Sequence, residues 1–485
     1  MDQRLSPSSG THFNQNAQLL FLRSALTLDN PFNDTQKVLE WVQERNREVK
    51  VNVERIPFAT MRNWFLDEAN IKLQHQSGKF FTIEGINVQT NSGPVPEWDQ
   101  PIINQPEVGY LGIITREFNG ILYFLLQAKI EPGNVNNVQL SPTLQATKSN
   151  YTKVHQGKTP NYLEYFTDRG RCEILLDQLQ SEQGARFLRK RNRNIIIKTE
   201  EDIPVLEDFC WLTLGQIKQL MRMDNVVNMD TRTVLSGISY GSHSNETVQF
   251  YNLINRGDTA PGPRFLTSEL NAEVALHTPD AIIHWFTNLK TRYDLLVKPL
   301  PLHSVRDWVI EEDQVRHKDD KFFRVIGVRV EISNREVTSW DQPLIEPVQE
   351  GICAFIAKEI RGVLHFLVQA KVESGNFDIL EMAPTVQCIT GSYRNEYSLH
   401  NLPYLSYVLE AKPETIVYDT LQSEEGGRFY REQNRNMILL AEENFPEETP
   451  ENYIWMTLHQ MKTFIKFNNY LNIQARSLIA AIAFQ

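Results

Sequence analysis

The sequence predicts an α+β protein built from two tandem copies of one fold, and two observations support this class. First, QAKIEPGN at 127–134 recurs as QAKVESGN at 369–376, and the same offset of 242 residues relates Phe80 to Phe322 and Asn194 to Asn436. Second, each copy opens with a helical spacing of apolar residues and continues with the period-two alternation typical of strands. A constant offset over this length indicates duplication, so we expect two similar structural units.

The repeat sets the expected domain boundaries. The N-terminal repeat occupies 1–238, with a core that begins at about residue 33, and the C-terminal repeat occupies 277–485. The polar segment 239–276 is expected to link them. Each repeat has the length of an ordinary domain and is long enough to bury a core of its own.

The elements follow the same order in both copies. An opening helix is expected over 35–46 and over 279–290, followed by strands, a further helix, a strand and a closing helix over 211–225 or 455–469. Thr213 and Thr457 are the expected N-caps of the closing helices. In the segment 179–194, Glu182 and Arg186 are four residues apart, a spacing that supports a helix.

Composition excludes several classes of protein. Sixty acidic side chains against 49 basic ones give a net charge of −11, which provides no general attraction for nucleic acid or for an anionic membrane. The four cysteines form no CxxC pair, so neither a disulfide framework nor a zinc ribbon is expected. The chain contains no signal-peptide stretch and no run approaching ~18 apolar residues. We therefore expect a cytoplasmic protein that binds neither nucleic acid nor membranes.

Polar residues with strand spacing mark the most informative surface. In YFLLQAKIE, the side chains of Gln127, Lys129 and Glu131 point to one face, while the apolar residues between them point to the other. After a break at 131–134, QLSPTLQAT alternates in the same way, so the two polar faces are expected to line one pocket. The alternative is the solvent-facing side of an antiparallel sheet, although such faces seldom repeat a row of uncharged amides.

The second copy keeps part of this set. Gln369, Lys371 and Glu373 are retained, but Glu381, Ala383 and Ile389 replace Gln139, Ser141 and Thr147. Downstream, the first copy carries Tyr151 and His155, where the second has Tyr393 and Tyr397. The first copy is therefore the better catalytic candidate, although a single loop histidine is more often incidental than catalytic.

Two further shared segments have both a functional and a structural interpretation. Arg189, Arg191, Arg193 and Asn194 form a basic run suited to diphosphate oxygens, because guanidinium groups make charge-assisted and often bidentate hydrogen bonds. A solvated helix end is the competing interpretation. Trp98, in the repeated WDQP motif, offers an aromatic plane for a nucleobase, but packing of the indole in a turn is the favoured interpretation.

Common catalytic motifs are missing from the sequence. It contains no GxGxxG after a strand, no GxxxxGK[ST], no HExxH, no GxSxG and no DxDxDG. These absences weigh against a nicotinamide enzyme, a Walker-type nucleotide site, zinc-dependent hydrolysis and serine hydrolysis.

The segments QAKIEPGN, QLSPTLQAT, SNYT, YLEYF and SEQGARFLRKRNRN, with their second-copy counterparts, strongly resemble the NDP-hexose 2,3-dehydratases of deoxysugar pathways. The resemblance covers nearly the whole chain. It implies two tandem Nudix-like domains, a homodimer and a dTDP-4-keto-6-deoxyglucose substrate, with neither a metal nor a cofactor. The Nudix signature string is absent from both copies.

The resemblance also suggests roles for the polar residues. In the implied reaction, a base removes the carbon 3 hydrogen next to the ketone, a cation stabilises the enolate and an acid protonates the departing carbon 2 hydroxyl. We expect Glu131 to be the base, Lys129 to stabilise the enolate, and Tyr151 or His155 to be the acid. The expected substrate-binding residues are Gln127, Asn134, Gln139, Ser141, Thr143, Gln145, Trp98, Arg186, Arg189, Arg193 and Asn194. The expected second pocket comprises Gln369, Lys371, Glu373, Thr385, Gln387, Tyr393, Arg428 and Arg431.

Two alternatives from other functional classes stay open on the sequence. One is a nucleotide-sugar-binding module without catalysis, and the other is a Nudix-like diphosphate hydrolase. The hydrolase would depend on a metal, and the binding module would bind a dTDP-sugar without releasing water.

Overall fold

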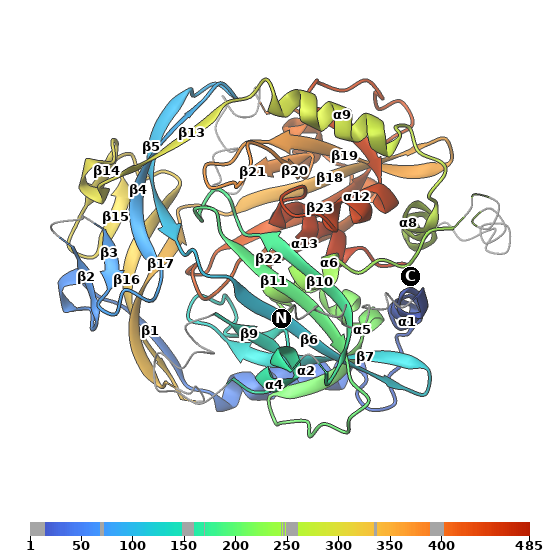
Figure 1. Cartoon of the computed structure of the whole chain (residues 1–485), viewed down its shortest axis with the longest axis horizontal. Helices are drawn as coiled ribbons and strands as arrows, with labels where there is room; N and C mark the ends of the chain where they lie inside the picture. Colours follow the sequence, from blue (N-terminus) through green and yellow to red (C-terminus); the bar gives the residue numbers. More distant parts are fainter. Residues whose placement is uncertain are drawn as a thin grey trace, which may run out of the picture.

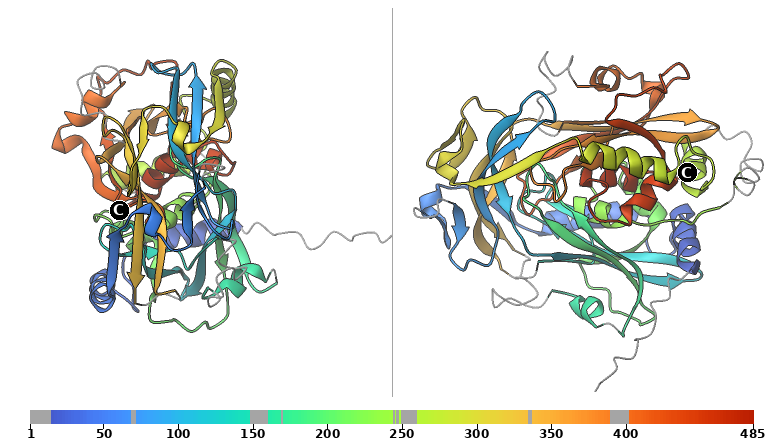
Figure 2. Two further views of the ribbon diagram at one scale, coloured as in Figure 1. Left: turned by 90° about the vertical axis from the view of Figure 1, so that its left-hand side faces the viewer. Right: turned by 45° about the horizontal axis from the view of Figure 1, so that its top comes forward.

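The computed structural model describes residues 15–485 except 68–71, 148–159, 169, 244, 246–247, 249–259, 334–336 and 389–401. These residues form two seven-stranded sheets and two five-stranded sheets, together with short helices. The α+β class and the repeated architecture are confirmed, because each sheet of one copy has a counterpart in the other. The two large sheets lie on either side of a central pair of helices (Figures 1 and 2).

Each large sheet is mixed. In the first copy, β11 runs parallel to β6, whereas the other described pairings are antiparallel. Its strands are β6 (Gly109–Phe118), β7 (Ile121–Ile130), β8 (Val138–Ser141), β9 (Leu144–Ala146), β10 (Glu173–Ser181), β11 (Arg191–Lys198) and β12 (Phe209–Thr213). Their counterparts are β18 (Gly351–Ile360), β19 (Val363–Lys371), β20 (Glu381–Ala383), β21 (Val386–Cys388), β22 (Ile416–Ser423), β23 (Gln433–Leu440) and β24 (Tyr453–Thr457).

Strands β6 and β7 form a fork. They pair from their hairpin as far as Ile114 and Leu125 and then separate, so that β8 pairs with β7 and β9 pairs with β6. Thr143 lies where the chain crosses from one arm to the other. Its hydroxyl donates to the carbonyl of Leu125 and accepts the N–H of Ile114 at 2.9 Å. The polar residues of β7, β8 and β9 are thereby brought into one region.

The two smaller sheets are built by exchange of strands between the copies. β1 (Val51–Arg55) pairs with β16 (Phe323–Ile332), and β13 (Leu295–Leu300) pairs with β4 (Thr82–Thr90) (Figure 1). The other strands of these sheets are β2 (Trp64–Leu66), β3 (Leu73–His75), β5 (Glu97–Asn104), β14 (Trp308–Ile310), β15 (Gln314–His317) and β17 (Ser339–Pro347). Each copy therefore completes a sheet of the other copy.

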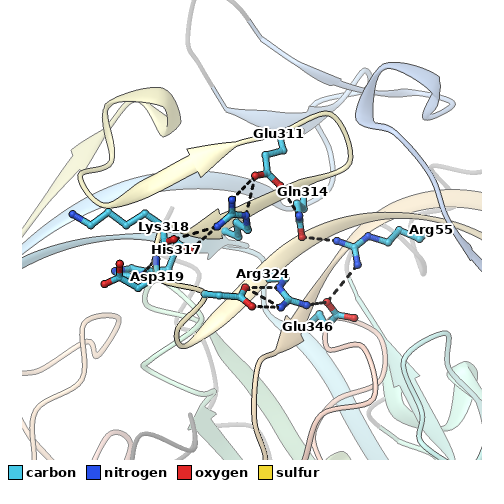
Figure 3. Close-up of polar contacts among 10 residues, drawn as sticks. Arg55, Glu311, Gln314, His317, Lys318, Asp319, Arg324 and Glu346 are labelled. Carbon is cyan, nitrogen blue, oxygen red and sulfur yellow. Dashed lines mark hydrogen bonds and ion pairs between the residues drawn. The ribbon is translucent and has the colours of Figure 1, made fainter.

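Side chains reinforce this exchange on the surface. Arg55, on the exchanged strand β1, donates to Gln314 Oε1 at 2.6 Å and lies 3.6 Å from a carboxylate oxygen of Glu346 (Figure 3). Arg324 joins the same Glu346 carboxylate at 3.2 Å. Exposed pairs of this kind contribute little to stability individually, so the exchanged strands are held mainly by their backbone hydrogen bonds.

The expected opening and closing helices are confirmed. α2 (Thr35–Glu48) and α9 (Pro279–Lys290) open the copies. α5 (Leu214–Leu220) and α12 (Leu458–Ile465) each begin with a capping box, in which Thr213 and Thr457 accept the backbone N–H of Gln216 and Gln460. The residues directly before these helices, 209–213 and 453–457, form the strands β12 and β24. The closing helices therefore begin a few residues later than expected.

The prediction of a helix within 179–194 is wrong. Residues 173–181 form a strand, and the segment that follows makes a single turn in which the Phe187 N–H donates to the Gln183 carbonyl at 2.8 Å. Leu188 then pairs with the backbone of Ile103, because its N–H donates to that carbonyl at 2.8 Å. Tertiary pairing with β5 thus outweighs the weak helix preference of the Glu182 and Arg186 spacing.

The segment 239–276, expected to be a linker, includes the helix α8 (Pro261–Leu270). This helix repeats the packing of α1 (Gln15–Leu26): Ser24 and Ser268 donate to the carbonyls of Leu122 and Leu364, at 2.5 Å and 2.6 Å. Short helices complete the description: α4 (Leu163–Thr167), α11 (Leu405–Leu409) and the 3-10 turns Phe58–Thr60, Leu302–Ser304 and Pro413–Thr415. Among the described helices, none is long and apolar enough to cross a membrane.

The central helices α6 (Met229–Ser236) and α13 (Ile473–Ala481) pack together and are fully buried. Each carries an arginine that reaches into the other copy. Arg232 donates to the Ser423 carbonyl at 2.6 Å and to Gln422 Oε1 at 2.8 Å, whereas Arg476 donates to the Ser181 carbonyl. These contacts hold the strand ends from which the two exchanged turns project.

The turns 182–188 and 424–430, here called the exchanged turns, pack against the Gly-Asn motifs of the opposite copies. The Gly133 N–H donates to the Gly426 carbonyl at 2.8 Å, and the Gly375 N–H donates to the Gly184 carbonyl at 2.6 Å. A β-carbon on Gly133 would lie 1.7 Å from the Phe429 carbonyl oxygen. The repeated glycine therefore permits backbone contact between the copies.

Replacing Gly133 with alanine is expected to destabilise the protein by about 3 kcal/mol or more, because the new methyl group overlaps rigid backbone. Gly170→Ala is the matched control, since its nearest atom would be 3.8 Å away, and we expect a change within about 0.5 kcal/mol. Denaturant midpoints of both variants and the unsubstituted protein provide the comparison. Equal midpoints for the two variants would contradict the proposed role of this contact.

Candidate functional site

Three of the predicted residues form one buried polar network inside the fork. Lys129 Nζ donates to Gln145 Oε1 at 2.8 Å, and Gln145 Nε2 donates to Glu131 Oε1 at 2.9 Å. The Lys129 ammonium also lies 3.7 Å from Glu131 Oε1. Lys129 and Glu131 are only 9% and 6% exposed, so this face of β7 is not the solvated side of a sheet.

Helix α6 covers this network and adds a carboxyl group. The side chain of Asn228, the N-cap of α6, donates to Ser141 Oγ at 2.9 Å, which attaches the first turn of the helix to β8. Asp230, in that turn, is 2% exposed. Burial, followed by the negative charges of Glu425, Glu182 and Glu131, raises the pKa of Asp230 well above its usual value.

The second copy contributes the opposite wall through its exchanged turn. A β-carbon on Gly427 would lie 3.3 Å from Glu425 Oε1 and 3.4 Å from Glu131 Oε1, so both carboxyl groups face the same point. Burial raises the pKa of Glu425, while Arg428 acts in the opposite direction. The site therefore contains groups from both copies.

Glu182 completes the group of carboxyls. Asn192 donates to Glu182 Oε1 at 2.7 Å, and burial together with the charge of Glu425 raises the Glu182 pKa to about 7. We call the following set the first-copy cluster: Lys129, Glu131, Gln145, Glu182, Asp230 and Glu425. The cluster joins several titratable groups in a buried space, an arrangement typical of acid–base sites.

Two oxygen atoms of the first-copy cluster lack partners. Among the described residues, neither Glu131 Oε2 nor Asp230 Oδ1 has a hydrogen-bond partner, although both atoms are buried. Buried polar atoms of folded proteins are normally paired, so unpaired oxygens indicate capacity to bind a ligand. Both lie in the region where β7, α6 and the exchanged turn of the second copy meet.

The equivalent region of the second copy has a similar frame but places its carboxyls differently. Gln387 Nε2 donates to Glu373 Oε1 at 2.9 Å, and Thr385 bridges the arms of the fork as Thr143 does. Lys371 and Gln369 occupy the matching places on β19, where both are half-buried. However, Gln474 replaces Asp230, Gln183 replaces Glu425 and Ala185 replaces Gly427.

Other predicted sugar-binding residues have structural contacts. Gln139 Oε1 accepts the Ser423 hydroxyl at 2.8 Å, and Asn134 Nδ2 donates to the Asn137 carbonyl at 2.6 Å. Thr143 uses its hydroxyl to bridge the fork, as described above. Gln127 is half-buried on β7, opposite Ser141 of β8.

The predicted phosphate-binding arginines occupy separate environments. Arg193 forms an ion pair with Asp177 at 2.6 Å, and Arg189 is exposed. Arg186 is 2% exposed, with its guanidinium 4.3 Å from the ring centroid of Phe323. The buried amide of Asn194 donates to Thr233 at 3.2 Å. The structure therefore does not bring these residues together as one basic cluster.

Arg428 and Arg431 are both expected in the second pocket, but Arg428 lies on the exchanged turn that contacts the first copy and Arg431 directly follows this turn. The Arg428 guanidinium is 4.2 Å from the ring centroid of Phe81 and donates to Gln105 Oε1 at 3.1 Å. The Arg431 N–H donates to the Gly133 carbonyl at 2.7 Å. Tyr151, His155 and Tyr393 lie outside the described residues.

The WDQP motif forms a clamp between the copies. The Trp98 indole donates to Gln100 Oε1 at 2.8 Å, and Gln100 donates to the carbonyl of Ala185 in the exchanged turn at 3.0 Å. Arg306 of the second copy binds Asp99 at 2.8 Å and lowers the pKa of Asp99 to about 2. The second copy repeats these contacts with Trp340, Gln342, Asp341 and Arg62. The indole is half-buried against an apolar cluster, which agrees with packing.

One surface hollow lies outside the first-copy cluster. This hollow of about 270 Å³ is lined by Gln43, Asn46, Arg47 and Asn137, none of which belongs to the first-copy cluster. Within the described parts of the chain, no group of three or more His, Cys, Asp or Glu side chains is arranged to hold a metal ion.

The sequence model of the NDP-hexose 2,3-dehydratase family matches residues 35–238 and, a second time, residues 279–482. The chain belongs to this family. Both matches agree with the repeat, and each spans one complete fork with its α6 or α13 helix.

Three relatives carry the same printed name, dTDP-4-dehydro-6-deoxy-alpha-D-glucopyranose 2,3-dehydratase. The protein from Saccharopolyspora spinosa is 45% identical over 95% of this chain and 94% of its own. The one from Amycolatopsis orientalis is 42% identical over 95% and 92%, and the one from Streptomyces violaceoruber is 41% identical over 93% and 97%.

Glu182, Asp230 and Glu425 were not among the sequence-predicted residues. The sequence predicts only a helix-supporting role for Glu182, and the other two lie outside the conspicuous polar strands. For Asp230 and Glu425 the signal is a difference between the copies, because they align with Gln474 and Gln183, whereas Glu182 aligns with Glu424. A search for conserved repeat positions passes over such residues, whereas a search for charge differences at equivalent positions finds them.

Acid should weaken the clamp formed by Asp99. Because its folded pKa is depressed from 3.8 to about 2, the Arg306 contact stabilises the protein above about pH 4, and this contribution is lost as the pH falls toward 2. At pH 7, Asp99→Asn is expected to lower the unfolding free energy by about 1–2 kcal/mol.

Asp202→Asn is the control for this prediction, because Asp202 forms an exposed pair with Arg116 and should contribute less than about 0.5 kcal/mol. Denaturant titrations at pH 7 and pH 3 measure the difference. A deficit in Asp99→Asn that persists unchanged at the lower pH would show that the carboxylate charge is not responsible.

Proposed function

We propose that this protein removes water from dTDP-4-keto-6-deoxyglucose and yields the 3,4-diketo-2,6-dideoxyhexose. Family membership and the common name of the three relatives, each matched along more than 90% of both chains, support this substrate. The observation that carries the proposal is the buried Lys129–Glu131–Gln145 network with its unpaired carboxylate oxygen.

Glu131 acts as the base in the proposed reaction. The ketone at carbon 4 acidifies the hydrogen on carbon 3, and the unpaired Oε2 of Glu131 accepts this proton. The other carboxylate oxygen is held by the Gln145 amide, which fixes the direction of the group. Proton removal transfers the electron pair of the C3–H bond to the enolate.

Lys129 stabilises the enolate oxygen. Its ammonium is positioned by Gln145 Oε1 and by the nearby Glu131 carboxylate. A cation held in a buried site stabilises a developing negative charge more strongly than a solvated one does. We expect Gln127, which lies on the same face of β7, to orient the sugar.

The other assignments remain predictions. Tyr151 and His155 are the sequence-based candidates for the acid, and diphosphate binding by Arg186, Arg189, Arg193 and Asn194 is not supported by a common cluster. A Nudix-like ancestry, a homodimer and a cytoplasmic location are further proposals that rest on the resemblance. The first copy is proposed as the catalytic one, because Asp230 and Glu425 of its site are replaced in the second by the amides Gln474 and Gln183.

A direct assay separates this proposal from the two alternatives. Incubation with dTDP-4-keto-6-deoxyglucose should give a dehydrated diketone, which can be trapped and identified by mass spectrometry. Binding of the ketosugar without loss of water would favour a non-catalytic module. Release of dTMP in a metal-dependent reaction would favour a diphosphate hydrolase.

Glu131→Gln is expected to lower turnover by about 10³-fold while leaving the affinity for dTDP nearly unchanged, because it removes the base and preserves the shape of the side chain. Steady-state kinetics and dTDP titration measure the two effects. The mirror variant Glu373→Gln should retain most turnover. The opposite pattern would move the reaction to the second copy.

Gly427→Ala tests whether the exchanged turn of the second copy lines the site. The added methyl group would lie between the carboxyls of Glu131 and Glu425, in space that the substrate needs, and turnover should fall by about 10²-fold. The fold already tolerates alanine at the equivalent position, Ala185, so the melting temperature should change little. Ala185→Gly is the reciprocal control, and loss of turnover in that variant alone would contradict this geometry.

A further inference from the structure

The two copies provide an internal comparison of their sites. Both keep the lysine, the strand glutamate and the amide that donates to this glutamate, which is Gln145 to Glu131 in the first copy and Gln387 to Glu373 in the second. Asp230 aligns with Gln474, on the same turn of the equivalent helix and after the same asparagine N-cap. An aspartate is therefore not required for the fold at this position, since the second copy builds the same helix with an amide.

The surroundings of Asp230 point to a ligand. Asn228 donates to Ser141 Oγ at 2.9 Å, and Thr231 Oγ1 donates to the Leu140 carbonyl at 3.0 Å, so the residues on both sides of Asp230 are attached to β8. Asp230 itself is 2% exposed, and its Oδ1 atom has no hydrogen-bond partner among the described residues. Because Ser141 pairs with Gln127 of β7, the first turn of α6 is attached to the end of the fork that carries Lys129 and Glu131.

We propose that Asp230 is a further catalytic residue, which donates the proton that converts the departing carbon 2 hydroxyl into water. This assignment deepens the proposed dehydration and rests on it. It differs from the sequence-based assignment of the acid to Tyr151 or His155. Glu425, contributed by the second copy, acts as a positioning residue that keeps the proton on Asp230.

The proposed steps balance without a redox partner. Glu131 takes the carbon 3 proton, and the C3–H electron pair forms the enolate of the carbon 4 ketone. The enolate then forms the C2–C3 double bond as the C2–O bond breaks with its electron pair on oxygen. The proton of the Asp230 carboxyl joins this oxygen, so that water leaves and Asp230 becomes a carboxylate. The remaining enol tautomerises to the diketone.

The charges around Asp230 favour its protonated form. Burial is the largest cause, the neighbouring carboxyl groups of Glu425, Glu182 and Glu131 oppose ionisation further, and Lys129 acts in the opposite direction. Together with burial, the three carboxylates raise the pKa of Asp230 well above its usual value. A protonated carboxyl beside an ionised one is a common arrangement for paired acid and base roles.

The experiment compares Asp230→Asn with Glu131→Gln in deuterated buffer, using dTDP-4-keto-6-deoxyglucose. Because enolate formation precedes loss of the hydroxyl, Asp230→Asn should lose dehydration by about 10²–10⁴-fold but still exchange the carbon 3 hydrogen for deuterium, as seen by NMR. Glu131→Gln should lose both reactions. Gln474→Asn, the matched change on the equivalent helix, should retain both.

Retained exchange also shows that Asp230→Asn folds and binds its substrate. Dehydration at the normal rate in this variant would overturn the assignment, and so would a parallel loss of exchange and dehydration. If the unsubstituted protein catalyses neither reaction, the proposed function itself fails and the assignment fails with it. Failure of the Asp230 assignment alone can therefore be distinguished from failure of the proposed function.

The pH dependence of kcat tests the part played by Glu425. An acid catalyst works only while protonated, so kcat should fall as the pH rises through the pKa of Asp230. Glu425→Gln removes a neighbouring negative charge and should lower the pKa of Asp230. The high-pH limb of the kcat profile should therefore move to a pH about one unit lower. An unmoved limb, or a limb moved upward, would overturn the positioning role.

Discussion

Backbone contact between two glycine-containing motifs and two exchanged turns is the constraint on which the structure depends. Gly133 meets Gly426, and Gly375 meets Gly184, at distances that leave no room for a β-carbon on Gly133 or Gly375. Strand exchange, the buried arginines of α6 and α13, and the WDQP clamps all keep these turns in place. Neither fork is complete without the opposite copy.

This reciprocity explains how a duplicated protein can contain two different sites. Each fork receives its far wall from the other copy, so substitutions that follow Glu182 or Glu424 in an exchanged turn change the opposite site. Glu425 and Gly427 alter the first-copy cluster, whereas Gln183 and Ala185 line the equivalent region of the second copy. The two sites can therefore share one backbone arrangement and differ in their charged side chains.

Much of the frame could be predicted from the sequence, because repeats, helix caps and strand alternation are local signals. Thr213 and Thr457 cap the helices as expected, and Lys129 and Glu131 share one buried face. The helix expected at Glu182 was wrong because pairing with β5 is a long-range interaction. For the same reason, the roles of Glu425 and Gly427 could not be predicted. They contact a fork that is roughly three hundred residues away in the chain, and the spacing of residues in the sequence does not indicate such a contact.

The central claim is that one reaction site is assembled from the fork of the first copy and the exchanged turn of the second. A crystal structure of the Glu131→Gln variant with bound dTDP-4-keto-6-deoxyglucose would test this claim most directly. We predict that carbon 3 lies about 3.5 Å from the side chain of residue 131, between β7 and Gly427, with the carbon 2 oxygen directed toward Asp230. A hexose bound only at the second-copy fork, or remote from Gly427, would contradict the account.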